Sequence, residues 1–163
     1  MNAEAFRQLY EYHFAENRKT WDYYIPSLAQ EQFVQPSNYS LGSVRNHFIH
    51  LINVDTSWFC ELRGVEIPDW LDPAQFEDRQ EIRVRLDAVE QMMRGYLATL
   101  RDDMLFDKPF EGEDKDLIVW QVLIHVVNHG TDHRAQILRL LSDLGVRTAP
   151  QDYVYYLYDH PTT

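Results

Sequence analysis

The sequence predicts an all-α fold, namely a four-helix bundle followed by a short C-terminal helical segment. In four long stretches, apolar side chains recur at intervals of three and four residues, the spacing that gives an α-helix one buried face. Turn-forming glycines and prolines separate these stretches, and no glycine-rich nucleotide-binding motif occurs. The chain has 163 residues, of which 45% are hydrophobic, so we expect one domain, 1–163, around one core.

The first two helices are predicted over residues 3–24 and 41–62. Pro26 ends the first apolar pattern because proline lacks the backbone N–H that a continuing helix needs. Ser40 is expected to cap the second helix, since a serine oxygen can accept a backbone N–H from the first turn. Gly64 follows that helix as a stop signal.

The third and fourth helices are predicted over residues 78–101 and 117–144, with an acidic, irregular connection between them. Gly145 is expected to end the fourth helix. A tyrosine-rich helical segment over 151–158 then closes the fold. Four amphipathic helices of this length are typical of a bundle, and bundles build metal sites from side chains on facing helices.

The charge of the chain excludes several kinds of partner. The formal net charge is −11, and no cluster of lysine and arginine stands out. We therefore expect no nucleic-acid partner, because such binding needs a basic surface that displaces counterions from phosphates. The same charge argues against binding to an anionic membrane surface.

Cysteine content and hydropathy bear on the compartment. Cys60 is the single cysteine, which excludes an intrachain disulfide and a cysteine-based zinc cage. We interpret it as a small buried hydrophobic residue and not as a reactive thiol. No stretch approaches the roughly 20 apolar residues that cross a bilayer, and the N-terminus lacks a signal-peptide pattern. We expect a cytoplasmic protein.

The most informative motif is a series of three histidines on the fourth predicted helix: His125, His129 and His133. Residues four apart on a helix advance by about 400°, so successive rings lie about 40° round and about 6 Å along the axis. Two imidazoles in that relation can bind one transition-metal ion. On a helical projection His129 and His133 flank the centre of the apolar face, while His125 lies near its edge. His125 is therefore interpreted as a flanking or supporting residue.

A metal site would need a third ligand from another helix, and the second helix offers His47 and His50. The helical projection places His47 nearer the apolar face and His50 on the shoulder of the helix. A shoulder position can still face a neighbouring helix across a groove. Periodicity thus mildly favours His47 and leaves both histidines open as the third ligand.

Two segments carry a resemblance to a known family. The first is Ser43-Val44-Arg45 followed by His50-Leu51 and Trp58, and the second runs from Asn128 to Ile137 and contains His129 and His133. In their order and spacing they resemble the DinB/YfiT-like family of metal-dependent enzymes, and the likeness covers most of the chain. The resemblance implies a metal held by His50, His129 and His133, which selects His50 over His47. Ala135 departs from the glycine found in many relatives.

The resemblance also implies a function. Three histidines leave at least one position open on a divalent transition metal, with zinc or nickel expected, so such a site suits catalysis or substrate binding. The expected activity is that of a transferase that activates a low-molecular-weight thiol. The alternatives are a metal-dependent hydrolase and a bundle that binds metal or ligand without turnover. We expect a small-molecule substrate and a homodimer, and the sequence identifies no catalytic residue.

Several other side chains could support a metal site. Candidates to hold a ligand histidine by its second ring nitrogen are Asn46, Asn53, Asp55, Asn128, Asp132 and Gln136. Of these, Asp55 is notable because it lies on an apolar helix face. Arg134 is expected to hold a substrate anion or to pair with a carboxylate. Core packing is the preferred interpretation of six aromatic residues, with pocket lining or dimer contact as the alternative: Trp58, Trp70, Trp120, Tyr153, Tyr155 and Tyr156.

Overall fold

The computed structural model describes residues 1–161 and confirms the all-α prediction, since these residues contain no strand. The four long helices are α1 (Ala3–Lys19), α3 (Val44–Leu62), α4 (Arg79–Thr99) and α5 (Val119–Asp143). Two short helices, α2 (Gln30–Val34) and α6 (Tyr153–Asp159), complete the fold. The long helices begin and end within a few residues of the predicted bounds.

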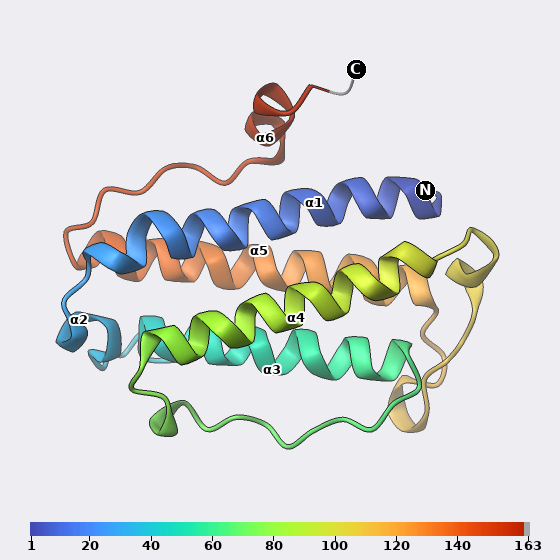
Figure 1. The fold of residues 1–163 in the computed structure, drawn as a ribbon, viewed down its shortest axis with the longest axis horizontal. Coiled ribbons are helices and arrows are strands. Elements are labelled where there is room, and N and C mark those ends of the chain that lie inside the picture. Colours follow the sequence, from blue (N-terminus) through green and yellow to red (C-terminus); the bar gives the residue numbers. More distant parts are fainter. Residues whose placement is uncertain (162–163) are drawn as a thin grey trace.

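The four long helices form a ring in which each one packs on two others (Figure 1). α1 packs against α4 and α5, and α3 packs against the same two helices from the opposite side. The long connection over residues 63–78 returns along the bundle, so that α3 and α4 run in the same direction. α5 runs antiparallel to α3, which brings the middle of the one helix beside the middle of the other. α6 lies outside the ring, next to α1.

The core consists of two apolar clusters with a layer of polar side chains between them. One cluster is built around Phe6, Phe14 and Phe59, and the other around Phe48 and Ile137. The polar layer between them contains these buried residues: His13, Glu16, Asn53, Asp55, His133 and Arg134. Buried polar groups need hydrogen-bond partners, so this layer is where function or structural pairing must be sought.

The predicted cap of the second long helix is wrong by three residues. Ser43, and not Ser40, caps α3, and its Oγ accepts the backbone N–H of Asn46 at 3.1 Å. Ser40 lies in a tight turn with a φ of 48°, followed by Gly42 with a φ of 89°. This left-handed backbone turns the chain before the helix starts, so the helix begins three residues later than predicted.

The other stop signals act as predicted, with one local change. Gly64 and Gly145 follow α3 and α5 with φ values of 62° and 82°, the left-handed conformation that ends a helix. The first predicted helix continues beyond α1 as a π-helical turn over Thr20–Tyr24 before Pro26. The Thr20 hydroxyl donates to the Glu16 carbonyl at 2.7 Å where the helix widens.

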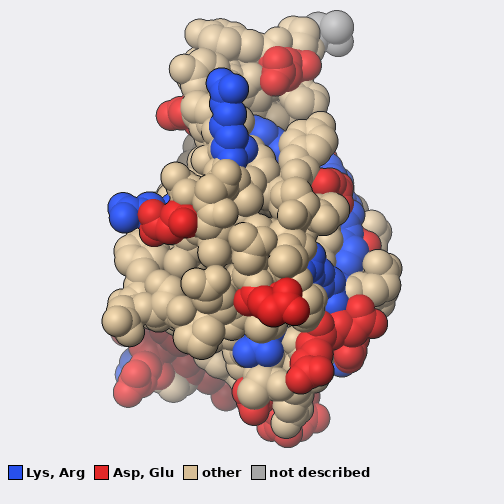
Figure 2. Space-filling model, turned by 90° about the vertical axis from the view of Figure 1, so that its left-hand side faces the viewer, with Lys and Arg blue, Asp and Glu red and all other residues tan. Residues whose placement is uncertain are grey.

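The surface carries charges of both signs. Figure 2 shows the end of the bundle on the left of Figure 1, where lysine, arginine, aspartate and glutamate side chains are scattered among uncharged residues. Among residues 1–161, no helix combines the length and the hydropathy needed to span a membrane.

Candidate metal centre

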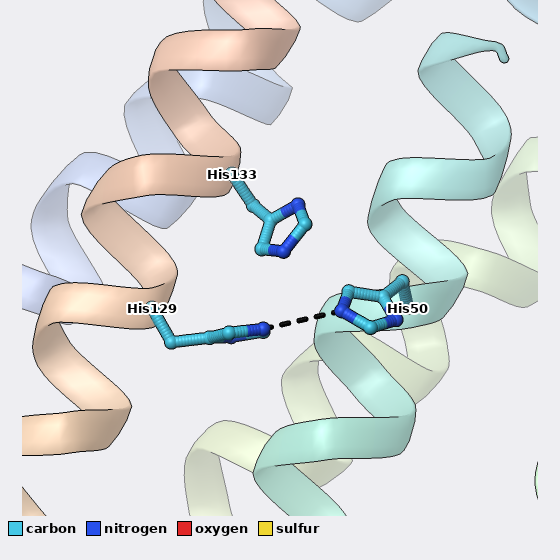
Figure 3. Close-up of side chains that lie close together, drawn as sticks. All are labelled: His50, His129 and His133. Atoms are coloured by element: carbon cyan, nitrogen blue, oxygen red, sulfur yellow. Dashed lines mark hydrogen bonds between the residues drawn. The ribbon is translucent and has the colours of Figure 1, made fainter. Parts of the chain in front are cut away.

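Three histidines meet between α3 and α5 (Figure 3). His50 extends from α3, and His129 and His133 extend from successive turns of α5. One nitrogen of each ring lies within 4.8 Å of one nitrogen of each of the others. The Nε2 atoms of His50 and His129 are 3.1 Å apart, and the ring centroid of His133 lies 4.5 Å from that of His50 and 4.4 Å from that of His129.

The position of His50 on its helix explains why it belongs to this cluster. His50 lies on the shoulder of α3, and the adjacent helix on that side is α5. His47 lies nearer the centre of the buried face and is fully buried. The cluster forms at the edge of the helix–helix contact and not in its centre, so it contains His50 and not His47, which the periodicity mildly favours.

The geometry of the cluster fits a transition-metal ion. Two imidazole nitrogens bound to one tetrahedral ion at bond lengths of 2.0–2.1 Å lie about 3.3 Å apart. The 3.1 Å between the Nε2 atoms of His50 and His129 is close to that separation. His50 and His129 are only partly buried, whereas His133 is buried, so the cluster opens toward solvent on one side. An ion held here would keep an accessible coordination position.

The electrostatics of the cluster favour neutral rings. Burial, followed by the charges of neighbouring histidines, lowers the pKa of His129 from 6.5 to about 4. Burial is also the main cause that lowers the pKa of His50 and of His133. At neutral pH the three imidazoles therefore carry free lone pairs, and a metal need not displace a proton to bind.

His47 contacts the cluster from the buried face of α3. Its Nδ1 lies 3.2 Å from Nδ1 of His133, so that Nε2 of His133 is the nitrogen left for a metal. Burial lowers the pKa of His47 to about 4, which keeps this ring neutral as well. The sequence alone leaves open whether His47 is the third ligand or assists the site. A histidine three residues before the ligand, on the inner face of the same helix, is the signal that could have identified this role.

Among residues 1–161, none of the six polar candidates for this supporting role bonds to a histidine of the cluster. Asn53 instead pairs with both the N–H and the C=O of Leu71, at 2.9 and 3.0 Å, and so fastens the long connection to α3. Gln136 donates to Asp132 at 2.9 Å and accepts the hydroxyl of Ser40. His125 is exposed, as its place on the helix predicts, and its ring packs against Trp58.

Asp55 and Arg134 belong to a second polar group, which we call the buried polar cluster: His13, Asn17, Asp55 and Arg134. Asp55 is buried, as its position on an apolar face predicts, and its Oδ2 lies 3.9 Å from Nε2 of His13. Arg134 is 0% exposed and donates to Asn17 at 2.7 Å and to Thr131 and Gln151 at 3.0 Å. The expected contact of Arg134 with a substrate anion is wrong, because its donors are already engaged inside the bundle.

A close approach of α1 to α5 makes the buried polar cluster possible. His13 packs on the backbone of Gly130, where an added Cβ would fall 2.9 Å from Nδ1 of His13 and closer still to Cε1. The neighbouring Nη1 atom of Arg134 lies 3.3 Å from Nδ1 of His13. A glycine directly after His129 thus lets the two helices approach beside the histidines.

The long connection over residues 63–78 passes beside the three histidines and places Trp70 next to His50. Trp70 is 59% exposed, and its indole N–H donates to Ser57 Oγ at 3.0 Å. The indole lies edge-on to the ring of His50, with centroids 6.0 Å apart. Core packing is therefore the wrong interpretation for Trp70, and also for the partly exposed Tyr153 and Tyr155 of α6. Trp58 and Trp120 pack against the core while staying partly exposed.

Comparison with known proteins identifies the family of this chain. A family model described as the DinB family matches residues 1–162. Over 167 aligned residues the chain is 28% identical to Protein DinB of Bacillus subtilis (strain 168), and the alignment covers 97% of this chain and 96% of that protein. Both matches extend over nearly the full length of the chain, so they include the four long helices and the two segments that carry the three histidines. The chain belongs to the DinB family.

Proposed function

We propose that this protein binds a divalent transition metal through His50, His129 and His133 and uses it to activate a low-molecular-weight thiol for transfer to a small electrophilic molecule. The observation that carries the proposal is the convergence of three neutral imidazoles, within 4.8 Å of one another, at a site open to solvent on one side. Zinc and nickel both suit a set of nitrogen ligands.

The three-histidine group contains no carboxylate oxygen, which favours a thiol over water as the nucleophile. A bound zinc or nickel ion would supply Lewis acidity, which removes the proton from a coordinated thiol and lowers the pKa of coordinated water toward about 7. Hydrolytic sites commonly add a carboxylate as general base. Among residues 1–161 no carboxylate joins the three-histidine group, and Asp55 faces His13 instead. A thiol that is already deprotonated needs no such base.

The chain's own residues then have defined tasks. His47 holds the ring of His133 by its Nδ1, which fixes the tautomer and the orientation of a ligand. Trp70 and the exposed side of His129 border the space through which a substrate would reach the site. In the transfer itself a carbon–sulfur bond forms, and the leaving group departs with the electron pair of the bond that breaks.

Metal content is the first test. Protein purified without a polyhistidine tag, incubated with zinc or nickel and desalted should contain about one metal ion per chain by elemental analysis. His50→Ala and His129→Ala should lose the metal and its effect on the melting temperature. At a thousandfold excess of metal over its Kd that effect corresponds to about 4 kcal/mol. His125→Ala is the matched control and should keep both. Equal metal content in all four proteins would contradict the proposed ligand set.

Reaction with thiols is the second test. The metal-loaded protein should accelerate the attack of some member of a thiol panel on a generic electrophile, and chelation or His129→Ala should remove the acceleration. Metal-dependent turnover of esters or amides without any thiol would favour the hydrolase instead. If metal binds with no turnover in either assay, the non-catalytic binding protein is the remaining reading.

A further inference from the structure

A groove of about 310 Å³ lies directly beside the three histidines and shares His129 with them. It is bordered by α3, by the long connection, by the 3₁₀ turn Gly112–Asp114 and by α5. The side chains that give it chemical character are Trp58, Trp70, Glu61, Asp114 and His125. Its volume suits a small molecule or one end of a larger one.

Two carboxylates face this groove without a cation. Glu61 comes from the last turns of α3, and Asp114 comes from the turn before α5. Among residues 1–161 neither carboxylate forms an ion pair or a side-chain hydrogen bond, and no lysine or arginine borders the groove. Burial and the nearby charge of Asp114 both raise the pKa of Glu61. The two groups therefore repel each other, and a positive charge between them would relieve that repulsion.

The two tryptophans add a second attraction for a cation. Trp70 is held by its hydrogen bond to Ser57, and its ring remains largely exposed. Trp58 is held edge-on between Phe110 and His125, with ring centroids 6.0 and 5.4 Å away. Indole rings attract cations through their negative faces, most strongly where water is partly excluded. Fixed indoles together with unpaired carboxylates are a combination suited to ammonium groups.

A second metal ion fits this groove less well than an organic cation. His125, Glu61 and Asp114 do not come within the 4.8 Å that unites the three-histidine group among residues 1–161. A metal ion needs its ligand atoms at such short separations, whereas an alkylammonium group is larger and can be held by dispersed contacts.

We propose that the groove bordered by Trp58, Trp70, Glu61 and Asp114 binds the ammonium group of a small organic amine whose other end reaches the three histidines. The ligand that this protein uses would then be an amine-bearing molecule. The position of that other end rests on the proposed metal function, but recognition of the ammonium group does not, because Trp58, Trp70, Glu61 and Asp114 are not among the proposed metal ligands.

The test begins with metal-free protein in a chelating buffer. Isothermal titration calorimetry compares benzylammonium with benzyl alcohol, which has a similar shape and no charge. Benzylammonium should bind more tightly, and the preference should weaken with added salt. Glu61→Gln and Asp114→Asn should each weaken benzylammonium binding about fivefold, and together they should remove the preference for the cation. Glu113→Gln alters an exposed neighbour that does not border the groove, and should leave binding unchanged.

These variants separate recognition from folding. Removing one of two repelling carboxylates should leave the melting temperature equal or higher, so loss of binding will not reflect loss of structure. Trp70→Leu should weaken benzylammonium more than benzyl alcohol, because the indole attracts charge beyond its apolar area. Equal binding of the two probes by the unaltered protein, or equal losses in Glu113→Gln and Glu61→Gln, would overturn the inference.

A second experiment tests whether a ligand bound in the groove also reaches the metal centre. Cobalt-loaded protein is titrated with 2-aminoethanethiol, 2-mercaptoethanol and 3-mercaptopropionate, and the absorption of the cobalt–sulfur bond is followed. The affinity should fall in that order, from the cationic to the neutral to the anionic thiol. Glu61→Gln should reduce the differences between the three affinities. If cobalt does not bind while benzylammonium still does, the proposed metal function fails and the amine site stands. If all three thiols bind equally, the link between groove and metal centre is wrong.

Discussion

The three-histidine centre and the buried polar cluster lie in the same polar layer of the bundle, yet they resolve the cost of burying imidazoles in opposite ways. In the buried polar cluster, His13 and Arg134 have partners from α1, α5 and the chain before α6, while Oδ1 of Asp55 is buried without a hydrogen bond among residues 1–161. In the three-histidine centre, one nitrogen of each ring lies within 4.8 Å of one nitrogen of each of the others, and among residues 1–161 none of these rings forms an ion pair. Buried groups that satisfy each other hold the fold, whereas groups that only another species can satisfy mark a site.

The comparison also separates two neighbouring residues of α5. His133 and Arg134 are adjacent in sequence, but they project about 100° apart on the helix and enter different clusters. One side of α5 therefore serves the site and the other anchors the bundle, and substitutions on the two sides should have separable effects.

The largest effect is expected from Arg134→Ala. It removes a fully buried guanidinium and leaves Asn17, Thr131 and Gln151 without their donor. We expect the free energy of unfolding to fall by about 3–5 kcal/mol, as judged by urea denaturation of metal-free protein. The exposed Arg139→Ala on the same helix should change it by no more than about 0.5 kcal/mol. If the two variants were equally stable, the structural role of the buried polar cluster would be lost.

His47→Leu should affect the three-histidine centre and not the buried polar cluster. The leucine has a similar volume but cannot hold Nδ1 of His133, so the ligand ring loses its fixed orientation. Metal affinity, measured by competition with a chelator, should fall roughly 10–100-fold while about one ion per chain still binds at saturation. His125→Leu should leave the affinity unchanged. An effect of His47→Leu confined to thermal stability would show that His47 is only a packing residue.

Gly130→Ala should destabilise the protein through the contact between α1 and α5. The new methyl group would collide with the ring of His13, and a displaced ring costs about 1–3 kcal/mol even though alanine favours the helix. Gly95→Ala on α4 is a sharp control, since its Cβ meets no atom within 4 Å, and this variant should gain about 0.5–1 kcal/mol. Two variants of the same sign in thermal denaturation would disprove the close approach.

The smallest effect near neutral pH is the change of the free energy of unfolding of the metal-free protein with pH. This change becomes larger as the solution is acidified. Burial lowers the pKa of His47 and of His129 from 6.5 to about 4, so the unfolded chain takes up protons before the folded one. Their contribution to stability is thus complete above pH 6.5 and is lost as the pH falls from 6.5 to about 4. Urea denaturation across this range in a chelating buffer should show the decline, and His129→Gln should make it less steep, since the contribution of His47 remains. His125→Gln should retain the profile of the unaltered protein.

Much of the architecture could be predicted from local patterns. The spacing of apolar residues gives the four long helices, and Gly64 and Gly145 stop two of them, because such signals act within a few residues. The cap of α3 was misplaced because Ser40 and Ser43 have the same chemistry, and only the turn at Gly42 decides between them. Periodicity likewise identified His129 and His133 as the inward pair, while His50 came from family resemblance.

The all-α class, the helix bounds to within a few residues and the pairing of His129 with His133 could be derived from the sequence, because each depends on neighbours about one turn away. Only the packing of the helices shows that the shoulder of α3 faces α5, that His47 contacts His133, and that Arg134 is enclosed and not available to a substrate. It also brought Glu61 and Asp114 to one groove. These relations depend on how separate helices pack, and packing is set by the whole core, so no single segment of the sequence contains them.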